Sequence, residues 1–369
     1  MKKAIIFPPK YIQGEGVLEE IGEITKTYGA SKPMLVWGKR TRAASGDFVL
    51  GSLKERGLDS AEWAFEGECS KEQCSAIEAA IREQGCDIVV GLGGGKCLDI
   101  SKAAAAHLGL RVIICPTVCS SDAPTSACTV WYSSEGVCTG FDLWPVNPDA
   151  IIVDTGIMVL APEKMLKAGI GDALATYIEA RAANRKHSPA SSGGAPTMTA
   201  MALARICFDT LLEDTDAALT AVSAGVVNPS FERVVEACTL LSGVGWESGG
   251  LATAHQLGNN LTAFPEAHGA MHGEKVAFGI VTQFMLDPDV EMDEVYEVVD
   301  FMASVGLAVC FEDLSMHGVE RERIMQWCEN NTGEGAFTNN HSFPVGAKEL
   351  YNAMLAADAF GRARKAELL

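Results

Sequence analysis

The first 160 residues alternate short apolar runs with segments that repeat apolar residues at helical spacing. The apolar runs are rich in β-branched residues and lie at 34–37, 87–91, 112–115 and 151–153. Two of the intervening segments, 70–84 and 96–108, have the spacing of helices with one buried face. This alternation predicts a parallel sheet whose strands are connected by crossover helices.

Residues 126–141 break this alternation with the pattern of a β-hairpin. An apolar run at 129–132 and another at 137–141 flank the turn-forming sequence Ser-Ser-Glu-Gly. Turn residues between two such runs are typical of paired antiparallel strands. We therefore predict one antiparallel hairpin in addition to the parallel sheet.

From about residue 160 onward, the chain consists of long Ala- and Leu-rich segments with helical spacing. A stretch rich in Ser, Gly and Pro at 188–196 predicts a loop between two of these helices. The pattern thus predicts an α/β domain over residues 1–160 and an all-α domain over residues 161–369.

Composition and charge narrow the function. The chain has 369 residues, and its 29 Lys and Arg against 48 Asp and Glu give a formal net charge of −19. Proteins that bind nucleic acid or anionic membranes use clustered basic residues, so we expect neither partner. The N-terminus lacks the apolar run of ~7–15 residues of a secretion signal. No run reaches the ~18–20 residues of a membrane span, so a soluble, cytoplasmic protein is expected.

The twelve cysteines are scattered and form no Cys-x-x-Cys pair. In a chain without an export signal, this scatter predicts reduced thiols that serve as small core residues. On this basis the cysteines have no metal role.

A glycine-rich loop follows the second apolar run. Gly91, Gly93, Gly94 and Gly95 join that run to a helix that Lys96 opens. Backbone N–H groups in such a loop, together with the N-terminus of the helix, can bind phosphate oxygens. The spacing matches neither the full dinucleotide fingerprint nor a Walker A loop, so a tight turn is the alternative to a pyrophosphate site.

A polar loop, Pro116 to Pro124, follows the third apolar run. Ligands bind at the carboxyl ends of the strands in open parallel sheets. Asp122 in this loop is a candidate substrate contact. The alternative is a turn-forming Asp before Pro124.

Three histidines, His255, His268 and His272, lie close together in the second half of the chain. Imidazole is a good ligand for zinc and related metals, and a carboxylate such as Asp172 is a usual third partner. The glycine after each of the last two histidines argues against one continuous helix through both. The alternatives are ordinary polar histidines and, for Asp172, an N-cap.

Five motifs follow one another in an order that resembles one known family, the glycerol dehydrogenases of the iron-containing (group III) alcohol dehydrogenase superfamily. They are GLGGGKCLD, PTVCSSDAP, AGIGDALATYIEAR, LSGVGWESGGLATAH and HGEKVAFG. The resemblance runs from Tyr11 almost to the C-terminus. It implies a Rossmann-like domain over 1–160 that binds a nicotinamide dinucleotide, and an all-α domain over 161–369 that binds metal and substrate. This is the dehydroquinate synthase-like fold, with NAD or NADP expected in the cleft between the domains.

The resemblance also assigns site residues. Asp172, His255 and His272 match the family's metal ligands, and with Asp122, which matches its substrate-contacting Asp, they are the expected catalytic residues. Iron-dependent relatives generally add a His where this chain has Thr176. Because three protein ligands plus an open position are usual for catalytic zinc, Zn²⁺ is favoured and Fe²⁺ is the alternative.

The positions that match the family's cofactor contacts cluster in the two loops and the hairpin. They are Gly94, Gly95, Lys96, Cys97, Leu98, Asp99, Thr117, Val118, Cys119, Ser120, Ser126, Cys128 and Tyr132. The implied reaction is metal-dependent hydride transfer between a small polyol, alcohol or carbonyl compound and NAD(P), with glycerol to dihydroxyacetone as the leading case. Because members of this family commonly form rings, a homo-oligomer is expected.

Two positions depart from the family. Lys39 replaces the acidic residue that in NAD-using relatives accepts a hydrogen bond from the ribose, which favours NADP(H) through contact with the 2′-phosphate. The alternative is a solvated basic turn. Gly258 replaces a His of close relatives, which predicts a wider or drier pocket wall and leaves 2-oxo acid, butanol and other diol dehydrogenases of the superfamily as alternatives.

Two rivals belong to other classes. A lyase of the dehydroquinate synthase kind would need a basic phosphate pocket in the second domain, where Arg181, Arg185 and Lys186 are the only evident cluster. A nucleotide-binding protein without catalysis is the other rival, and the retained metal ligands argue against it.

Overall fold

The computed structural model describes residues 1–368, which form two compact units. The sheet unit comprises Ile6–Leu166 and Ala217–Gly243. The helical unit comprises Met1–Ile5, Lys167–Asp216 and the chain from Val244 onward. The division at residue 160 stays a prediction about domains. These units differ from it in three segments, because Met1–Ile5 lie in the helical unit and both 161–166 and Ala217–Gly243 lie in the sheet unit.

The sheet unit is built on six parallel strands in the order β1-β8-β5-β4-β2-β3, as the alternation predicts. The strands are β1 (Tyr11–Gly14), β2 (Pro33–Gly38), β3 (Ala61–Phe65), β4 (Ile88–Gly93), β5 (Arg111–Pro116) and β8 (Ala150–Asp154). The four apolar runs are β2, β4, β5 and β8, whose residues are almost all buried. Strands β1 and β3, at the two edges, have no such run and were not predicted.

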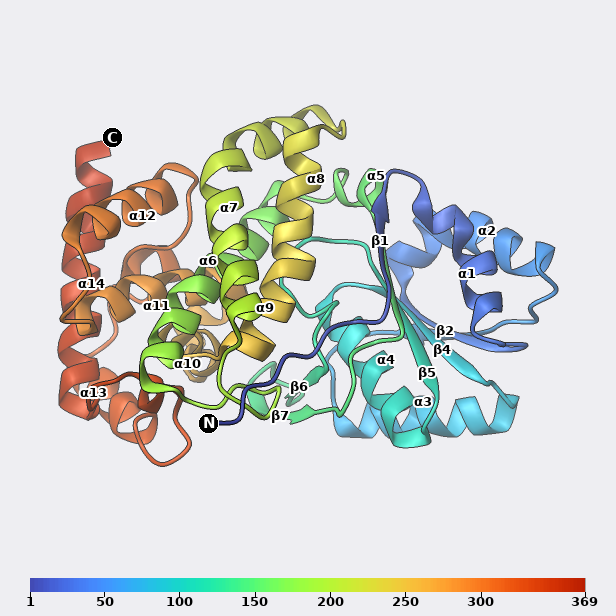
Figure 1. Cartoon of the computed structure of the whole chain (residues 1–369), viewed down its shortest axis with the longest axis horizontal. Helices are drawn as coiled ribbons and strands as arrows, with labels where there is room; N and C mark the ends of the chain where they lie inside the picture. The colour runs from blue at the N-terminus through green and yellow to red at the C-terminus, as the bar shows by residue number, and fades with distance from the viewer. Residues whose placement is uncertain (369) are drawn as a thin grey trace. The chain divides into compact units, whose positions relative to one another are not determined.

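Helices cover both faces of this sheet (Figure 1). One face packs on α3 (Lys71–Gln84) and α4 (Gly95–Leu108), and the other on η1 (Val17–Glu20), α1 (Ile21–Thr27) and α2 (Lys39–Glu55). Successive residues of a strand point to opposite faces. Accordingly, Met34 and Val36 of β2 join the first core, and Leu35 and Trp37 join the second.

The predicted hairpin is confirmed. Strands β6 (Cys128–Tyr132) and β7 (Cys138–Leu143) pair antiparallel across the turn at 133–136. The unit is completed by α5 (Thr155–Met158), α8 (Pro229–Glu236) and a π-helical turn, η2 (Ala237–Leu241).

The helical unit holds no β-strand among the described residues, which confirms the all-α expectation for this part. Its elements are α6 (Glu163–Lys186), α7 (Met198–Ala224), α9 (Ser242–Gly249), α10 (Thr253–Asn260), η3 (Leu261–Ala263), η4 (Pro265–Gly269), α11 (His272–Leu286), α12 (Met292–Ser304), η5 (Phe311–Leu314), α13 (Arg321–Asn330), η6 (Phe337–Asn340) and α14 (Ala347–Leu368). The first residues of α6 and α9 and the end of α7 belong to the sheet unit. The loop predicted at 188–196 separates α6 from α7.

Helices α6 and α11 approach each other backbone to backbone. A Cβ atom on Gly273 would lie 1.7 Å from the carbonyl oxygen of Ala168, and one on Gly171 would lie 2.5 Å from the carbonyl oxygen of Gly273. Only glycine leaves room for this contact. The contact brings the residues beside the two glycines, Asp172 and His272, close together.

All twelve cysteines are free thiols, and all but Cys138 are buried, as expected of small core residues. Among residues 1–368, no helix combines the length and the apolar character that crossing a bilayer requires.

We expect Gly273→Ala to destabilise the protein because the new methyl group overlaps a helical carbonyl that cannot move alone. Overpacking of this kind costs about 1–3 kcal/mol of unfolding free energy, measurable by urea denaturation. Gly269→Ala is the matched control, since its Cβ would have no atom within 4 Å. Equal stability of the two variants would contradict the close approach of α6 and α11.

Candidate active site

Three side chains from different helices converge in the helical unit. Asp172 comes from the middle of α6, His255 from α10, and His272 from the first position of α11. The Oδ1 atom of Asp172 lies 3.2 Å from Nε2 of each histidine. The N-cap alternative for Asp172 is therefore wrong, because the residue lies well inside its helix.

His268 does not join this cluster. It is exposed in η4, and its Nε2 atom lies 2.9 Å from the carbonyl oxygen of Thr262. The break between η4 and α11 confirms that no continuous helix carries both His268 and His272.

The cluster fits a divalent metal ion. The three ligand atoms lie within 4.8 Å of one another, and two imidazole nitrogens with one carboxylate oxygen suit zinc and related metals. Only 1% of the Asp172 side chain and 7% of the His255 side chain are exposed, whereas 33% of the His272 side chain is exposed. The open side at His272 leaves room for a further ligand.

The buried charges of this cluster shift one another's ionisation. Burial acts to raise the pKa of Asp172, but His272 and His255 outweigh it and the pKa is lowered. Burial acts to lower the pKa of His255, but Glu179 and Asp172 outweigh it and the pKa is raised. The site thus holds a carboxylate that stays ionised and favours a positive charge beside it.

Glu179 lies about two turns after Asp172 on the same side of α6, and it holds His255 in place. Its Oε2 atom accepts from Nδ1 of His255 at 2.5 Å, and its Oε1 atom accepts from the backbone N–H groups of Ala252 and His255 at 2.8 Å each. With Nδ1 donating to a carboxylate, Nε2 is left as the atom that faces Asp172. Carboxylate–histidine pairs of this kind orient metal ligands.

The N-terminus of α10 is capped from a distant helix. The Oε1 atom of Gln283, in α11, accepts from the N–H groups of Thr253 at 3.0 Å and Ala254 at 3.2 Å. His341 lies 2.8 Å from the Thr253 hydroxyl, and burial lowers the pKa of His341 to about 4. The first N–H groups of a helix need partners from outside it, and here buried side chains supply them.

Of the two expectations for Gly258, a wider or a drier pocket wall, the structure argues against the wider one. A Cβ at this position would lie 2.3 Å from Cγ2 of Val276, a fully buried side chain, and 3.3 Å from Cε1 of His272. Val276 thus fills the space that a larger residue would need, and the substitution does not widen this wall.

We expect Glu179→Gln to lower the affinity for the metal by about 10–100-fold, because the amide carries no charge to hold the His255 imidazole. The measurement is competition with a chelator at fixed pH, which does not depend on turnover. Glu213→Gln, at an exposed position of α7, is the control. An unchanged affinity in the Glu179 variant would show that His255 does not depend on this carboxylate.

In the sheet unit, the glycine loop lies where the strand order reverses. Strand β2 pairs with β3 on one side and with β4 on the other. Ligands of open α/β sheets bind beyond the carboxyl ends of such strands. Gly93 ends β4, and the fourteen-residue helix α4 begins after Gly94. Because Gly94 has no side chain, no side chain at this position caps the N-terminus of α4. The strand–glycine–helix prediction is confirmed, and this geometry suits an anion at the helix N-terminus.

The loop after β5 packs against the glycine loop. The N–H group of Thr117 donates to the carbonyl oxygen of Gly93 at 3.0 Å, and Val118 approaches Gly94. The Thr117 hydroxyl lies 3.5 Å from that of Thr41 in α2. Three segments that the sequence separates therefore meet at the ends of β2, β4 and β5.

The basic segment after β2 forms the first turn of α2. Lys39 and Arg40 are exposed, whereas Arg42 pairs with Glu62 at 2.6 Å and lies over the Trp37 ring. Lys39 thus lies at the carboxyl end of β2, and Arg42 is engaged within the protein.

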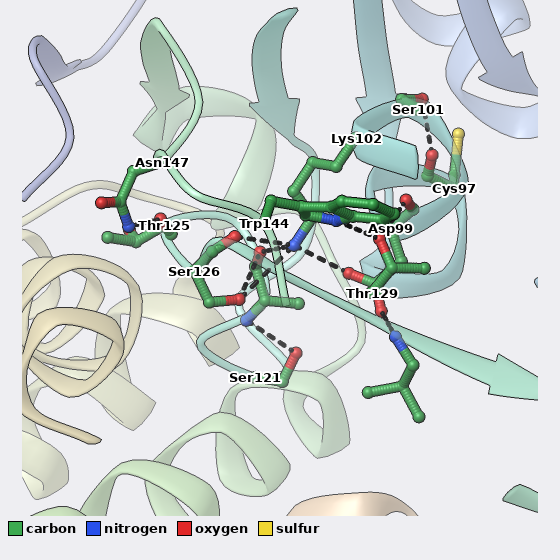
Figure 2. Close-up of polar contacts among 12 residues, drawn as sticks. Cys97, Asp99, Ser101, Lys102, Ser121, Thr125, Ser126, Thr129, Trp144 and Asn147 are labelled. Atoms are coloured by element: carbon green, nitrogen blue, oxygen red, sulfur yellow. Dashed lines mark hydrogen bonds and ion pairs between the residues drawn. The ribbon is translucent and has the colours of Figure 1, made fainter. Parts of the chain in front are cut away.

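A buried ion pair fixes the loop that carries Ser126 (Figure 2). The Nζ atom of Lys102, in α4, lies 2.9 Å from Oδ1 of Asp99 and donates to the carbonyl oxygens of Ala123 at 2.7 Å and Ser126 at 3.1 Å. The Oδ2 atom of Asp99 accepts from the N–H group of Val130 at 2.9 Å. The Asp99 carboxylate is thus engaged in holding the loop and β6 against α4.

Several other cofactor candidates have side chains that are buried or paired within the protein. The Cys97 thiol donates towards the carbonyl oxygens of Val36 and Leu92, and Leu98 is 1% exposed. The ammonium group of Lys96 pairs with Glu68 and lies over the Tyr132 ring. Cys119 and Cys128 are buried, and burial raises the pKa of Tyr132.

The turn expected at Asp122 is present, and its contact with substrate stays a prediction. Its carbonyl oxygen accepts from Thr125 at 3.3 Å, as in a turn, while its Oδ2 atom accepts from the Ser242 hydroxyl at 2.7 Å. Asp122 is 8% exposed, and its carboxylate is held by Ser242, which follows the π-helical turn η2.

Comparisons with known proteins give the family. Residues 8–155 match the model of the iron-containing alcohol dehydrogenases. The glycerol dehydrogenase of Pseudomonas putida is 40% identical over 98% of this chain and 99% of its own. The chain belongs to the glycerol dehydrogenase family of iron-containing alcohol dehydrogenases. It is therefore an oxidoreductase of alcohols, and its family implies a metal ion and a nicotinamide cofactor.

Two further members of this family support the match. A glycolaldehyde reductase of Halobacterium salinarum is 37% identical over 96% of this chain and 97% of its own. The crystal structure of the glycerol dehydrogenase of Schizosaccharomyces pombe superposes with a TM-score of 0.94, at 32% identity, over 99% of this chain and 93% of that one. The Rossmann-like sheet with a mostly helical remainder is thus the fold of this glycerol dehydrogenase family.

We expect Lys102→Met to destabilise the sheet unit by about 3–5 kcal/mol, because it leaves the buried Asp99 carboxylate without its cation. Urea denaturation measures this loss. Lys54→Met, at an exposed position of α2, should change the unfolding free energy by less than about 0.5 kcal/mol. A small effect in both variants would show that the ion pair does not hold the loop.

Proposed function

We propose that the protein oxidises glycerol to dihydroxyacetone with NAD(P)⁺, using Zn²⁺ held by Asp172, His255 and His272. The observation that carries the proposal is the convergence of these three side chains from α6, α10 and α11 around one buried carboxylate oxygen. Three protein ligands with an open side are the arrangement that catalytic zinc uses, which favours Zn²⁺ over Fe²⁺.

The metal, when bound, acts as a Lewis acid that favours the alkoxide form of the alcohol and so the loss of hydride from its carbon. The residues of this chain supply the rest. Glu179 holds the Nε2 atom of His255 towards the site, and Asp172 provides the negative charge that offsets a divalent cation. We assign Asp122 to accept a hydrogen bond from a substrate hydroxyl, with Ser242 holding its carboxylate.

The cofactor is assigned to the ends of β2 and β4. In this proposal the backbone N–H groups of Gly94, Gly95 and the first turn of α4 bind the pyrophosphate. The nicotinamide half of the cofactor is assigned to the loop after β5 and to β6, at Thr117, Val118, Cys119, Ser120, Ser126, Cys128 and Tyr132. Asp99 and Lys102 contribute to cofactor binding indirectly, because they hold the loop after β5 in place.

A substrate screen with Zn²⁺ and with Fe²⁺ in metal-free protein tests this proposal. We expect oxidation of glycerol to be restored most fully by Zn²⁺, and Asp172→Asn and His272→Ala to lose both bound metal and turnover. Glu213→Gln is again the control. Full activity in either ligand variant would refute the metal assignment, and a preference for monoalcohols or 2-hydroxy acids would refute the polyol assignment.

Reduction of a small hydroxyaldehyde is the second candidate. The observation in its favour is the glycolaldehyde reductase among relatives of similar identity. The same screen, run in the reductive direction with glycolaldehyde and dihydroxyacetone, separates the two candidates by kcat/KM.

The lyase alternative finds no support in the helical unit. Arg181 pairs with Glu294 at 2.8 Å, and Arg185 pairs with Asp287 at 2.8 Å. Lys186 donates to the carbonyl oxygen of Asn339. The basic cluster that a phosphate pocket would need is thus already engaged by the protein's own acceptors.

We expect Lys39→Asp to shift the cofactor preference from NADP⁺ towards NAD⁺, because Lys39 is assigned to the 2′-phosphate. A hydrogen bond between charged groups contributes about 1.5–3 kcal/mol, so the ratio of kcat/KM values should change by about 10–100-fold. Lys54→Asp, at the far end of α2, is the control for charge alone. A parent enzyme and a Lys39 variant that both strongly prefer NAD⁺ would refute the assignment.

We further propose that the protein is a homo-oligomer, as its family suggests, and sedimentation equilibrium would test this.

A further inference from the structure

A second group of metal-ligating side chains lies in the sheet unit, on the two helices that cover one face of the sheet. Cys74 and Glu78 lie one turn apart on α3, and His107 lies in the last turn of α4. None of the three belongs to the glycine loop, the loop after β5 or the Asp172 cluster.

The three ligand atoms are close enough to share one ion. The Cys74 Sγ atom lies 3.6 Å from Oε1 of Glu78 and 3.9 Å from Nδ1 of His107, and Nδ1 lies 2.7 Å from that same oxygen. All three atoms lie within 4.8 Å of one another. In tetrahedral zinc sites, metal–ligand distances of about 2.0–2.3 Å place neighbouring ligand atoms about 3.3–3.6 Å apart. To reach this geometry, the Glu78–His107 contact would open by about half an ångström and the Cys74–His107 distance would close by about 0.3 Å.

The surroundings give the site one closed side and one open side. Cys74 is 1% exposed, whereas the side chains of Glu78 and His107 are 14% and 42% exposed. Arg82 reaches the second oxygen of Glu78 at 3.5 Å, and the ring of Trp144 packs edge-on against His107. An ion could therefore enter from the His107 side and keep water as its remaining ligands.

We propose that Cys74, Glu78 and His107 form an accessory site for a thiophilic divalent cation such as Zn²⁺ or Co²⁺, separate from the catalytic metal. On binding, the Cys74 thiol releases its proton to solvent and forms the metal–sulfur bond. The Nδ1 atom of His107 gives up its hydrogen bond to Glu78 and becomes a ligand, with the ring proton on Nε2. No atom is oxidised or reduced.

Such an ion would link α3 to α4. Because α4 begins at the glycine loop, the site would stabilise the helix that carries the cofactor-binding turn, at its opposite end. Its effect is expected on the stability of the sheet unit, whereas the Asp172 cluster sets the chemistry.

Titration of metal-free, otherwise intact protein with Co²⁺ tests the proposal directly. The Asp172 cluster contains no sulfur, so a thiolate-to-Co²⁺ charge-transfer band in the near ultraviolet reports on a cysteine ligand and not on the Asp172 cluster. We expect this band to appear with a stoichiometry of one per chain, to be lost in Cys74→Ala, and to persist in Asp172→Asn. Glycerol oxidation should be unaffected by Cys74→Ala.

Two further variants guard against misfolding and stray thiols. His107→Gln changes a side chain that is 42% exposed, so the variant should fold normally. We expect it to need at least a tenfold higher Co²⁺ concentration to reach half of the maximal band. Cys138→Ser removes the one cysteine that is not buried and should leave the band intact. A protein that shows no band, or a band that survives Cys74→Ala, would overturn the proposal and leave the cluster as a His107–Glu78 pair packed on a thiol.

Discussion

The approach of two helix backbones at Gly171 and Gly273 is the constraint on which the candidate metal site depends. Side chains as short as aspartate and histidine can share an ion only when their backbones lie close together. With any larger residue at either glycine, α6 and α11 would separate, and Asp172 and His272 would separate with them. The geometry of the ligands is thus determined by residues that have no side chain.

Buried charge organises both units in a similar way. In the helical unit, Glu179 connects α6 to the start of α10, and in the sheet unit Lys102 connects α4 to the loop after β5. In both places the buried charge is paired and hydrogen-bonded, as burial requires. Because a buried charge tolerates little displacement, these pairs restrict the segments that carry the candidate site residues to one arrangement.

Sequence patterns predicted the parts of the fold that bury apolar residues on both sides. Strands β2, β4, β5 and β8 were found because they are continuous apolar runs, whereas β1 and β3 lie at sheet edges and are only partly buried. The candidate metal ligands could be predicted only through resemblance to a family, since Asp172 and His255 lie 83 positions apart in the sequence. Glu179 was missed as a partner of His255, although it shares a helix face with Asp172. Gln283 has no signal in the sequence, because its role is defined only by contact with α10.

The capping of α10 has a consequence for the order in which the protein folds. An eight-residue helix has little stability by itself, and the partners of its first N–H groups lie in α6 and α11. Helix α10 should therefore form late, after those two helices have docked. His255 then reaches its place only in a chain that is already nearly native, so tight binding of an ion at the candidate metal site would require completed packing of these helices.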